Sequence, residues 1–377
     1  MRIAFISTSS VPSRSANSIQ VLKVCQAFQK LGHEVKLWLP SSSPLPAWDA
    51  IASQYGISEP ISIKWLASLR VLKRYDFSLR ALLAARAWRP EAYYVWPLQA
   101  AAAAAMLGLP TLLEIHDRPQ GRFGPTLLRR FIKGGGKRRI LPITKALNQW
   151  LSESYGINLE PPFSIICPMG VDLERFANLP SPAEARSQLG LEETFTAGYS
   201  GHFYPGRGID LLFELALRNQ DINFIWMGGE DEAIEYWRGR VRAERIENIH
   251  LQGFIPNDEL PLYQAACEAL LMPYEKKIAT SSGGDTALFA SPMKVFEYMA
   301  AGRVIISSDL PVFREVLNPS NSILLPPNDA AAWTQALRRA KDDPHLRQTL
   351  ENEAQKGISA YSWVQRASRA LRGWDGI

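Results

Sequence analysis

Short apolar runs alternate with helical segments along this 377-residue chain. The first run, residues 3–6, precedes a Ser-rich loop and an expected helix from about Ser18 to Leu31, which Gly32 ends before a second run at residues 35–39. Strands joined through a helix run parallel, because a parallel pair needs a long crossover connection. The pattern therefore predicts an α/β fold with parallel sheets covered by helices.

The length of the chain predicts two domains. With 377 residues, 46% of them hydrophobic, it is too long for one ordinary core. A linker-like segment at residues 178–182 divides the strand series, so we expect two facing Rossmann-like domains, residues 1–178 and 179–360, with a cleft between them. The remaining strands are predicted at residues 93–96, 111–115, 139–143, 196–200, 223–227, 249–251, 269–272, 304–306 and 323–325.

Basic residues are concentrated in the first half of the chain. Residues 1–180 carry a formal charge of +11 and residues 181–377 one of −6, which gives +5 for the whole chain. Between Asp117 and Glu153 there is no acid, and this block can bind phosphates or an anionic membrane surface, or form a solvated basic face. Nucleic acid is not expected as a partner, since no aromatic interleaving accompanies the charge. The basic residues of the block are Arg118, Arg122, Arg129, Arg130, Lys133, Lys137, Arg138, Arg139 and Lys145.

The cysteines and the apolar runs bear on location. Cys25, Cys167 and Cys267 are far apart in sequence and form no metal-type or redox pair, so we expect no disulfide and a cytoplasmic setting. The alanine-rich run at residues 100–106 is too short to cross a bilayer. The sequence thus predicts a soluble protein or one held peripherally on the cytoplasmic membrane face.

The segment Ser291–Gly302 has the features of a helix that starts at an anion site. Ser291 can cap it, Pro292 suits its first turn, and Gly302 can end it. Free N–H groups then point at whatever precedes Met293, and a nucleotide diphosphate is the anion expected in an α/β protein. Glu297, on an otherwise apolar segment, needs a partner such as the hydroxyls of a ribose. Lys294 either approaches the phosphate or is an exposed helix lysine.

A second candidate ligand site is the loop Gly201–Gly208, which follows a predicted strand. Open α/β sheets bind ligands beyond the carboxyl ends of their strands. Arg207 can hold a diphosphate through charge-assisted hydrogen bonds, whereas His202 is only partly charged near neutral pH. The alternatives are an exposed turn arginine and a structural, neutral histidine.

In these motifs the chain resembles the family-4 retaining glycosyltransferases of GT-B architecture. The resemblance implies two facing Rossmann-like domains, an acceptor-side domain first and a sugar-nucleotide domain second, with a C-terminal helix in residues 361–377 packing back on the first. It rests on six blocks in the family's order, which are the early loop at residues 7–18, Glu114–Asp117, Cys167–Phe176, Gly201–Asp210, Gln252–Pro256 and Ser291–Gly302.

The resemblance also implies roles for single residues. His116 matches the acceptor-side histidine beside the reacting sugar, with a structural strand-end histidine as the alternative. Asn17 and Ser18 lie in the loop that approaches the phosphate, and they can also cap the following helix. Phe254 matches a nucleobase contact or is plain core.

The chain departs from the family pattern at two places. In the phosphate loop, His202 and Arg207 stand where the family usually has arginine and lysine, and Phe289 stands where it has the first of two glutamates. That glutamate touches the transferred sugar in the family, so Asp285 or backbone groups near Lys294 would have to replace it.

Taken together, these features predict a retaining glycosyltransferase that moves a hexose from a nucleotide-diphosphate sugar to a glycan or lipid-linked acceptor. We expect His116 and Arg207 to be catalytic. No Asp-x-Asp signature, Cys/His cluster or Walker-type loop occurs, so neither a metal nor a cofactor is expected. The alternatives are a sugar-nucleotide epimerase and a non-catalytic sugar-nucleotide-binding partner of another transferase.

Overall fold

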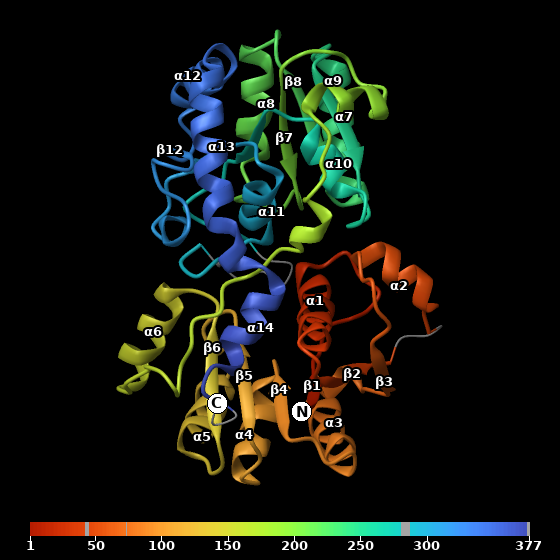
Figure 1. Cartoon of the computed structure of the whole chain (residues 1–377), viewed down its shortest axis with the longest axis vertical. Coiled ribbons are helices and arrows are strands. Elements are labelled where there is room, and N and C mark those ends of the chain that lie inside the picture. Colours follow the sequence, from red (N-terminus) through yellow and green to blue (C-terminus); the bar gives the residue numbers. More distant parts are fainter. Residues whose placement is uncertain (42–44, 73, 280–286, 375–377) are drawn as a thin grey trace. The chain divides into compact units, whose positions relative to one another are not determined.

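The computed structural model describes residues 1–41, 45–72, 74–279 and 287–374. The chain forms two compact units, the first made of Met1–Met169 with the C-terminal segment from Trp363, and the second of Gly170–Ser362. Each unit contains a six-stranded sheet, and every strand pair within it is parallel (Figure 1). The predicted α/β class with two Rossmann-like domains is confirmed.

The first sheet has the strand order β3-β2-β1-β4-β5-β6. The chain moves outward from β1 to β3, then returns to pair β4 with the other side of β1. Since crossovers are right-handed, the helices that follow β1 and β4 cover opposite faces, and a crevice opens at the carboxyl ends of these two strands. The strands are β1 (Arg2–Ile6), β2 (Glu34–Pro40), β3 (Ser62–Leu66), β4 (Ala92–Val95), β5 (Thr111–Ile115) and β6 (Arg138–Pro142).

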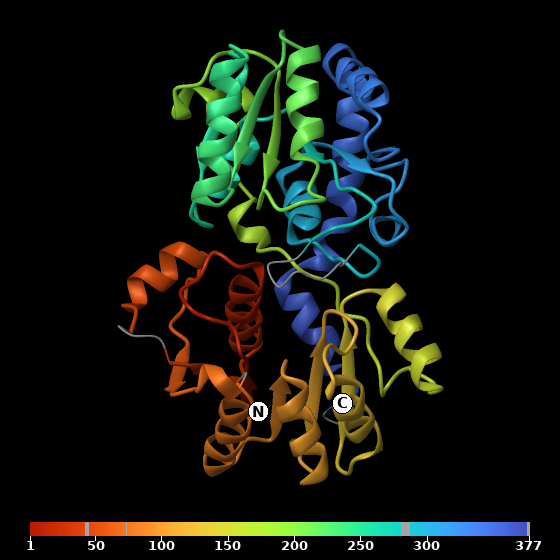
Figure 2. The same cartoon turned by 180° about the vertical axis from the view of Figure 1, so that it is seen from behind.

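Helices cover both faces of this sheet. On one face α1 contacts the C-terminal helix α14, and on the other α3 contacts α4, which contacts α5 (Figures 1 and 2). The helices of the first unit are α1 (Ala16–Lys30), α2 (Trp48–Tyr55), α3 (Tyr75–Ala87), α4 (Leu98–Met106), α5 (Gly124–Lys133), α6 (Lys145–Tyr155) and α14 (Trp363–Leu371).

The core of the first unit is built around β1 and α1. The Phe5 ring stacks on Tyr94 with centroids 5.0 Å apart and meets Phe28 edge-on at 5.2 Å. The predicted cap of α1 was wrong in detail, because Ser15 is the N-cap residue and accepts a hydrogen bond from the backbone N–H of Ser18. Asn17 and Ser18 therefore lie inside the first turn.

The second sheet repeats the first, with the order β12-β11-β10-β7-β8-β9 and its switch point between β7 and β10. Its four inner strands are buried throughout, as expected for a parallel sheet covered on both faces, whereas the edge strands β9 and β12 are largely half-buried. They are β7 (Thr196–Ser200), β8 (Asn223–Met227), β9 (Ile249–Gly253), β10 (Ala269–Met272), β11 (Val304–Ser308) and β12 (Ile323–Leu325).

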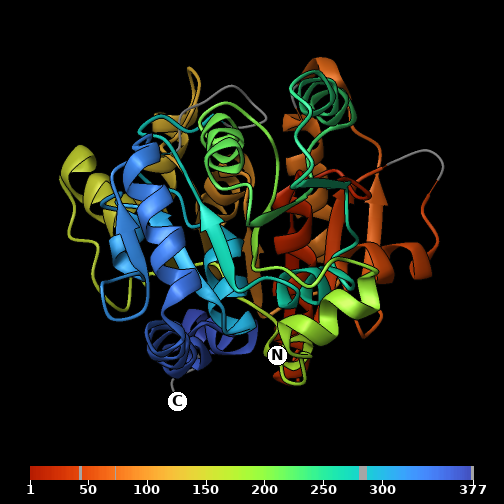
Figure 3. The same ribbon diagram turned by 90° about the horizontal axis from the view of Figure 1, so that it is seen from above.

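The helices of the second unit again form two groups. α8 contacts α12, whereas α11 contacts both α10 and α13, and Figure 3 shows these elements from above. The helices are α7 (Pro182–Leu189), α8 (Ile209–Arg218), α9 (Asp231–Ala243), α10 (Leu260–Ala265), α11 (Met293–Ala301), α12 (Ala330–Asp342) and α13 (Pro344–Ile358).

Two further findings bear on the sequence analysis. The edge strand β3 escaped prediction, since its side chains are half-buried or exposed and lack a strong apolar pattern. Among the described residues, no helix is both long and apolar enough to cross a membrane.

Candidate active-site residues

The phosphate-loop candidate lies at the switch point of the second sheet. Residues 201–208 follow β7, and their backbone passes close to the segment that follows β10. A Cβ at Gly206 would lie 1.9 Å from the carbonyl oxygen of Lys277, and one at Gly208 would lie 1.8 Å from that of Pro273. Both glycines also have positive φ, 83° and 75°. Only glycine fits at these positions, so the two flanking glycines fix the place of Arg207.

Arg207 and Lys294 meet at one aromatic ring. The guanidinium carbon of Arg207 lies 4.6 Å from the centroid of Tyr274, and the Lys294 Nζ lies 5.1 Å from the same centroid. Lys294 is 8% exposed, which excludes the exposed-lysine alternative. Gly201 leaves room for it, because a Cβ there would lie 2.7 Å from Nζ.

Neither cation forms an ion pair with a carboxylate in the described part of the chain. The Nζ of Lys294 and the Nε of Arg207 are both buried and lack hydrogen-bond partners there. Burial and the neighbouring Arg207 hold the pKa of Lys294 well below its ordinary value, although Glu297 acts in the opposite direction. A buried lysine and a half-buried arginine, each with a buried nitrogen that lacks a partner, form a site suited to an anion.

The start of α11 adds backbone donors to this site. The helix begins at Met293 and its cap residue is Pro292, with no side-chain cap, so the expected cap by Ser291 was wrong. The first paired amide of the turn is that of Val295, which donates to the Pro292 carbonyl oxygen at 3.2 Å. The amides of Met293 and Lys294 therefore remain available for an anion.

Glu297 and Phe254 occupy half-buried positions in the second unit. Glu297 lies on α11, about one turn beyond Met293, and its Oε2 accepts a hydrogen bond from the Gln264 side chain at 3.4 Å. Phe254 directly follows Gly253, whose φ is 74°. Because its ring is half-buried, Phe254 is not a plain core residue.

His202 is engaged differently from Arg207. Its Nδ1 lies 2.5 Å from Glu230 Oε1, and its ring stacks on Tyr204 with centroids 4.8 Å apart and an angle of 4° between the planes. A histidine held by a carboxylate cannot supply the unopposed positive charge that an arginine would bring to this loop.

The position of the missing glutamate is buried. Phe289 is 3% exposed, so an apolar ring packs where the family places an acid that touches sugar. Asp285, the suggested replacement, lies outside the described residues. Within those residues, no group of three or more His, Cys, Asp or Glu side chains is arranged to hold a metal ion.

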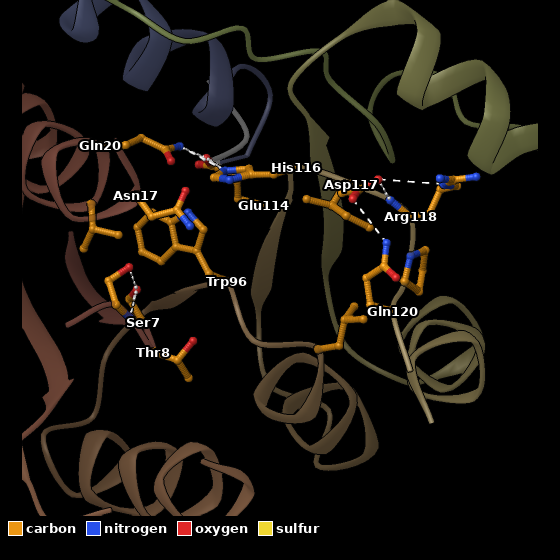
Figure 4. Close-up of a pocket in the computed structure, with 15 residues that line it drawn as sticks. Ser7, Thr8, Asn17, Gln20, Trp96, Glu114, His116, Asp117, Arg118 and Gln120 are labelled. Carbon is orange, nitrogen blue, oxygen red and sulfur yellow. Dashed lines mark hydrogen bonds and ion pairs between the residues drawn. The ribbon is translucent and has the colours of Figure 1, made fainter. Parts of the chain in front are cut away.

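The first unit contains a cavity of about 220 Å³ at its own switch point (Figure 4). The loops after β1, β4 and β5 line it together with the start of α1. Its polar lining includes Ser7, Asn17, Gln20, Trp96, His116 and Asp117. Ser18 does not line it, because its hydroxyl turns back to the carbonyl oxygens of Ser15 at 2.7 Å and Ser13 at 3.1 Å.

His116 is tied to a buried carboxylate that the sequence analysis did not single out. Its Nε2 lies 2.6 Å from Glu114 Oε1, while the Arg366 Nη2 on α14 lies 2.8 Å from Glu114 Oε2. Tyr94 and Gln20 also donate hydrogen bonds to Glu114. Burial alone raises the pKa of Glu114, but Arg366, His116 and Tyr94 together lower it to about 2. The signal in the sequence was an acid within an apolar strand.

The basic block divides into two kinds of residue. Arg129, Arg130 and Lys133 on α5 are exposed. Arg139, however, is 1% exposed and donates to the carbonyl oxygens of Pro162 and Ala370, each at 2.7 Å. Arg139 is thus a structural residue and no part of a basic face.

Comparison with protein families assigns both halves of the chain. Residues 18–175 match the family described as Glycosyltransferase Family 4, and residues 194–343 match the one described as Glycosyl transferases group 1. Together the two matches include most of both units.

Related proteins of assigned function are distant in sequence. The phosphatidyl-myo-inositol mannosyltransferase of Mycolicibacterium smegmatis is 22% identical over 412 aligned positions, which cover 100% of this chain and 94% of that protein. TuaH of Bacillus subtilis, named as a teichuronic acid biosynthesis glycosyltransferase, is 29% identical over 154 residues, which are 40% of this chain and only 35% of that protein.

Solved structures share the fold over the full length. The Anabaena protein Alr3699/HepE in complex with UDP has a TM-score of 0.75 at 16% identity and 100% coverage of both chains. A glycosyltransferase of Rickettsia africae has a TM-score of 0.76 at 12% identity, covering 100% of this chain and 98% of its own. With both halves matched by glycosyltransferase families and the fold shared along its whole length, this chain belongs to the family-4 glycosyltransferases of GT-B architecture.

Proposed function

We propose that this glycosyltransferase is a retaining, metal-independent enzyme that moves a hexose from a nucleotide-diphosphate sugar to a glycan or lipid-linked acceptor. The observation that carries the proposal is the pair of cations Arg207 and Lys294 beside the start of α11, where the buried Arg207 Nε and Lys294 Nζ have no hydrogen-bond partner among the described residues. The Anabaena neighbour, crystallised with UDP and with UDP-glucose, supports a sugar nucleotide as the ligand.

The proposed chemistry follows from the charge of this site. Negative charge grows on the diphosphate as its bond to the anomeric carbon breaks, and positioned cations and amides lower the energy of that state. Arg207, Lys294 and the amide of Met293 would provide this stabilisation without a metal ion. Removal of one such donor typically lowers the rate on the order of 10²- to 10³-fold.

The other predicted residues take supporting parts in this proposal. Glu297 would bind the ribose hydroxyls, and Phe254 would lie against the base. His116, beside the cavity of the first unit, would hydrogen-bond a hydroxyl of the reacting sugars. Asn17 and His202 remain predicted donor contacts, whereas Ser18 is buried and its hydroxyl is bonded to the backbone. Retention of configuration is inferred only from the resemblance to the family. In such a reaction the acceptor hydroxyl attacks the anomeric carbon on the same face from which the diphosphate leaves.

Calorimetry with a nucleoside diphosphate tests whether Arg207 and Lys294 bind the donor. A thermal-shift panel of UDP-, GDP- and ADP-sugars first identifies the base, because a bound ligand stabilises the fold. Arg207→Met and Lys294→Met should then each weaken binding of the matching nucleoside diphosphate roughly tenfold, or about 1.4 kcal/mol. Arg242→Met is the control, since Arg242 is an exposed arginine on α9, 73% exposed. Unchanged affinity in both test variants would refute the site.

A non-catalytic sugar-nucleotide-binding partner is the second candidate, and buried Phe289 favours it. Without an acid at that position the donor sugar loses one contact, so binding could persist without transfer. Incubation of the enzyme with its sugar nucleotide, with and without an acceptor extract, separates the candidates. If the sugar nucleotide binds tightly but is neither transferred nor hydrolysed, the result supports the partner role.

We also propose that an anionic membrane surface holds the protein on the cytoplasmic side. The outer face of α3 exposes Tyr75, Leu79 and Leu83, which are spaced four residues apart and 36%, 48% and 61% exposed. Just before it, Val71 is 83% exposed and Leu72 is 47% exposed. The arginines Arg80 and Arg86 on the same helix are exposed as well, and a stripe of apolar and basic residues is typical of helices that lie on anionic lipid.

A further inference from the structure

The carboxylate of Glu114 organises one wall of the first unit's cavity. It is 2% exposed, and each of its oxygens receives two donors. Oε2 receives the Tyr94 hydroxyl and the Arg366 guanidinium, while Oε1 receives the side chains of Gln20 and His116. Because an ionised carboxylate only accepts hydrogen bonds, each of these four groups must turn a donor toward it.

This arrangement fixes which atom of His116 carries a proton. Nε2 faces the carboxylate at 2.6 Å and must therefore carry hydrogen. In the neutral ring Nδ1 is then a lone-pair acceptor, and within the described residues it has no hydrogen bond. His116 lines the cavity, so that lone pair is available to a ligand there (Figure 4).

The same logic applies to Gln20. Its amide nitrogen donates to Glu114 and also lies 3.1 Å from His116 Nε2, so its carbonyl oxygen points elsewhere, and that buried oxygen has no partner in the described structure. The cavity therefore presents two acceptors, which suit the hydroxyl protons of a sugar. The indole N–H of Trp96, buried and also unpartnered, supplies one donor beside them.

Arg366 keeps the carboxylate charged and in place. It is 1% exposed and comes from α14, far away in the sequence. Its Nη1 donates to the Tyr94 hydroxyl at 3.1 Å, and its Nε donates to the Pro168 carbonyl oxygen at 2.8 Å. A buried carboxylate without such a cation would take up a proton, and a neutral acid could donate as well as accept.

We propose that Glu114 and Arg366 are positioning residues, which hold the proton of His116 on Nε2 so that Nδ1 accepts a hydrogen bond from a sugar hydroxyl. The identity of the hydroxyl rests on the proposed function, whereas the position of the proton does not. The proposed function and the position of the His116 proton can therefore be refuted independently of each other.

The test is NMR of the full chain, without substrate, with ¹⁵N-labelled histidine at pH 8.5. The chain has five histidines, and the His116→Gln variant identifies the signals of this ring. The expected spectrum shows Nε2 as the protonated nitrogen and Nδ1 as the bare one. A ring protonated on Nδ1 would overturn the proposal.

Glu114→Gln gives a sharper second measurement. Tyr94 and Arg366 would draw the new amide oxygen to their side, leaving the amide N–H₂ facing His116 Nε2. The ring should then move its proton to Nδ1, and a tautomer that stays unchanged would contradict the assigned role. Asp117→Asn is the matched control, because Asp117 lies next to His116 but bonds to Arg118 and Gln120, so the proton should remain on Nε2.

Discussion

The ammonium nitrogen of Lys294 lies 3.8 Å from the centroid of the Tyr199 ring, and within the described residues it has no hydrogen-bond partner. Burial disfavours the charge of this amine, and the neighbouring Arg207 makes the charge still less favourable. An anion bound between the two cations would reverse that balance. The diphosphate of the proposed donor is such an anion.

Donor binding should be coupled to proton uptake at Lys294. Its pKa is well below 10.5 in the free protein and should rise when a diphosphate binds, so affinity should increase as pH falls through the interval between the two values. Calorimetry with a UDP-sugar in buffers of different ionisation enthalpy measures this uptake. Lys294→Met should abolish it, and equal uptake in both proteins would assign the proton elsewhere.

Replacement of Glu297 should weaken nucleotide binding more than it lowers the rate at saturating donor. Ribose hydroxyls are bound equally in the ground and transition states, so Glu297→Gln should raise the KM for donor about tenfold with little change in kcat. Steady-state kinetics provide the measurement. A large fall in kcat at constant KM would place Glu297 at the reacting bond instead.

Gly208→Ala should destabilise the second unit far more than Gly190→Ala. Both glycines have positive φ, 75° and 66°, so each substitution costs about 1–2 kcal/mol in backbone strain. Only the Cβ at Gly208 meets the Pro273 carbonyl oxygen, at 1.8 Å, while nothing lies within 4 Å at Gly190. Urea unfolding compares the two variants. Equal urea midpoints for the two variants would show that the loop at residues 201–208 shifts easily to accommodate the added Cβ.

The α3 surface should bind vesicles that contain anionic lipid. The double change Leu79→Ser and Leu83→Ser removes two exposed leucines and should reduce co-flotation with phosphatidylglycerol vesicles roughly tenfold or more. Leu217→Ser is the control, because Leu217 is 40% exposed on α8 of the other unit. If pure phosphatidylcholine vesicles bind equally well, the arginines of α3 have no part in the attachment.

The Glu114 network should stabilise the protein above about pH 4.5 and lose this effect in acid. The pKa of Glu114 is lowered from 4.5 to about 2, so the folded state resists protonation and the stabilisation fades as pH falls between these values. The difference in unfolding free energy between wild type and Glu114→Gln should therefore shrink from pH 5 to pH 2. Glu232→Gln, an exposed change on α9, should give no such trend.

Much of this protein could be predicted from its sequence because the relevant forces are local. Apolar runs followed by helical segments predicted eleven of the twelve strands in the described part of the chain, and glycines predicted where helices end, as at Gly302. Arg207 was singled out because its loop follows a predicted strand, and the structure brings it to the same ring as Lys294, while its contact with a diphosphate stays a prediction. The half-exposed edge strand β3 left no such signal.

Tertiary structure decided which charged groups meet. Lys294 could have been an exposed helix lysine, and only the packing of α11 against Tyr199 and Tyr274 buries it. Arg366 and Glu114 are separated by most of the chain, yet their ion pair fixes the atoms that His116 presents to the cavity. The sequence determined the α/β elements and the candidate loops, because propensity and turns act over a few residues. Burial and pairing of charges depend on contacts between distant segments, and no local pattern encodes them.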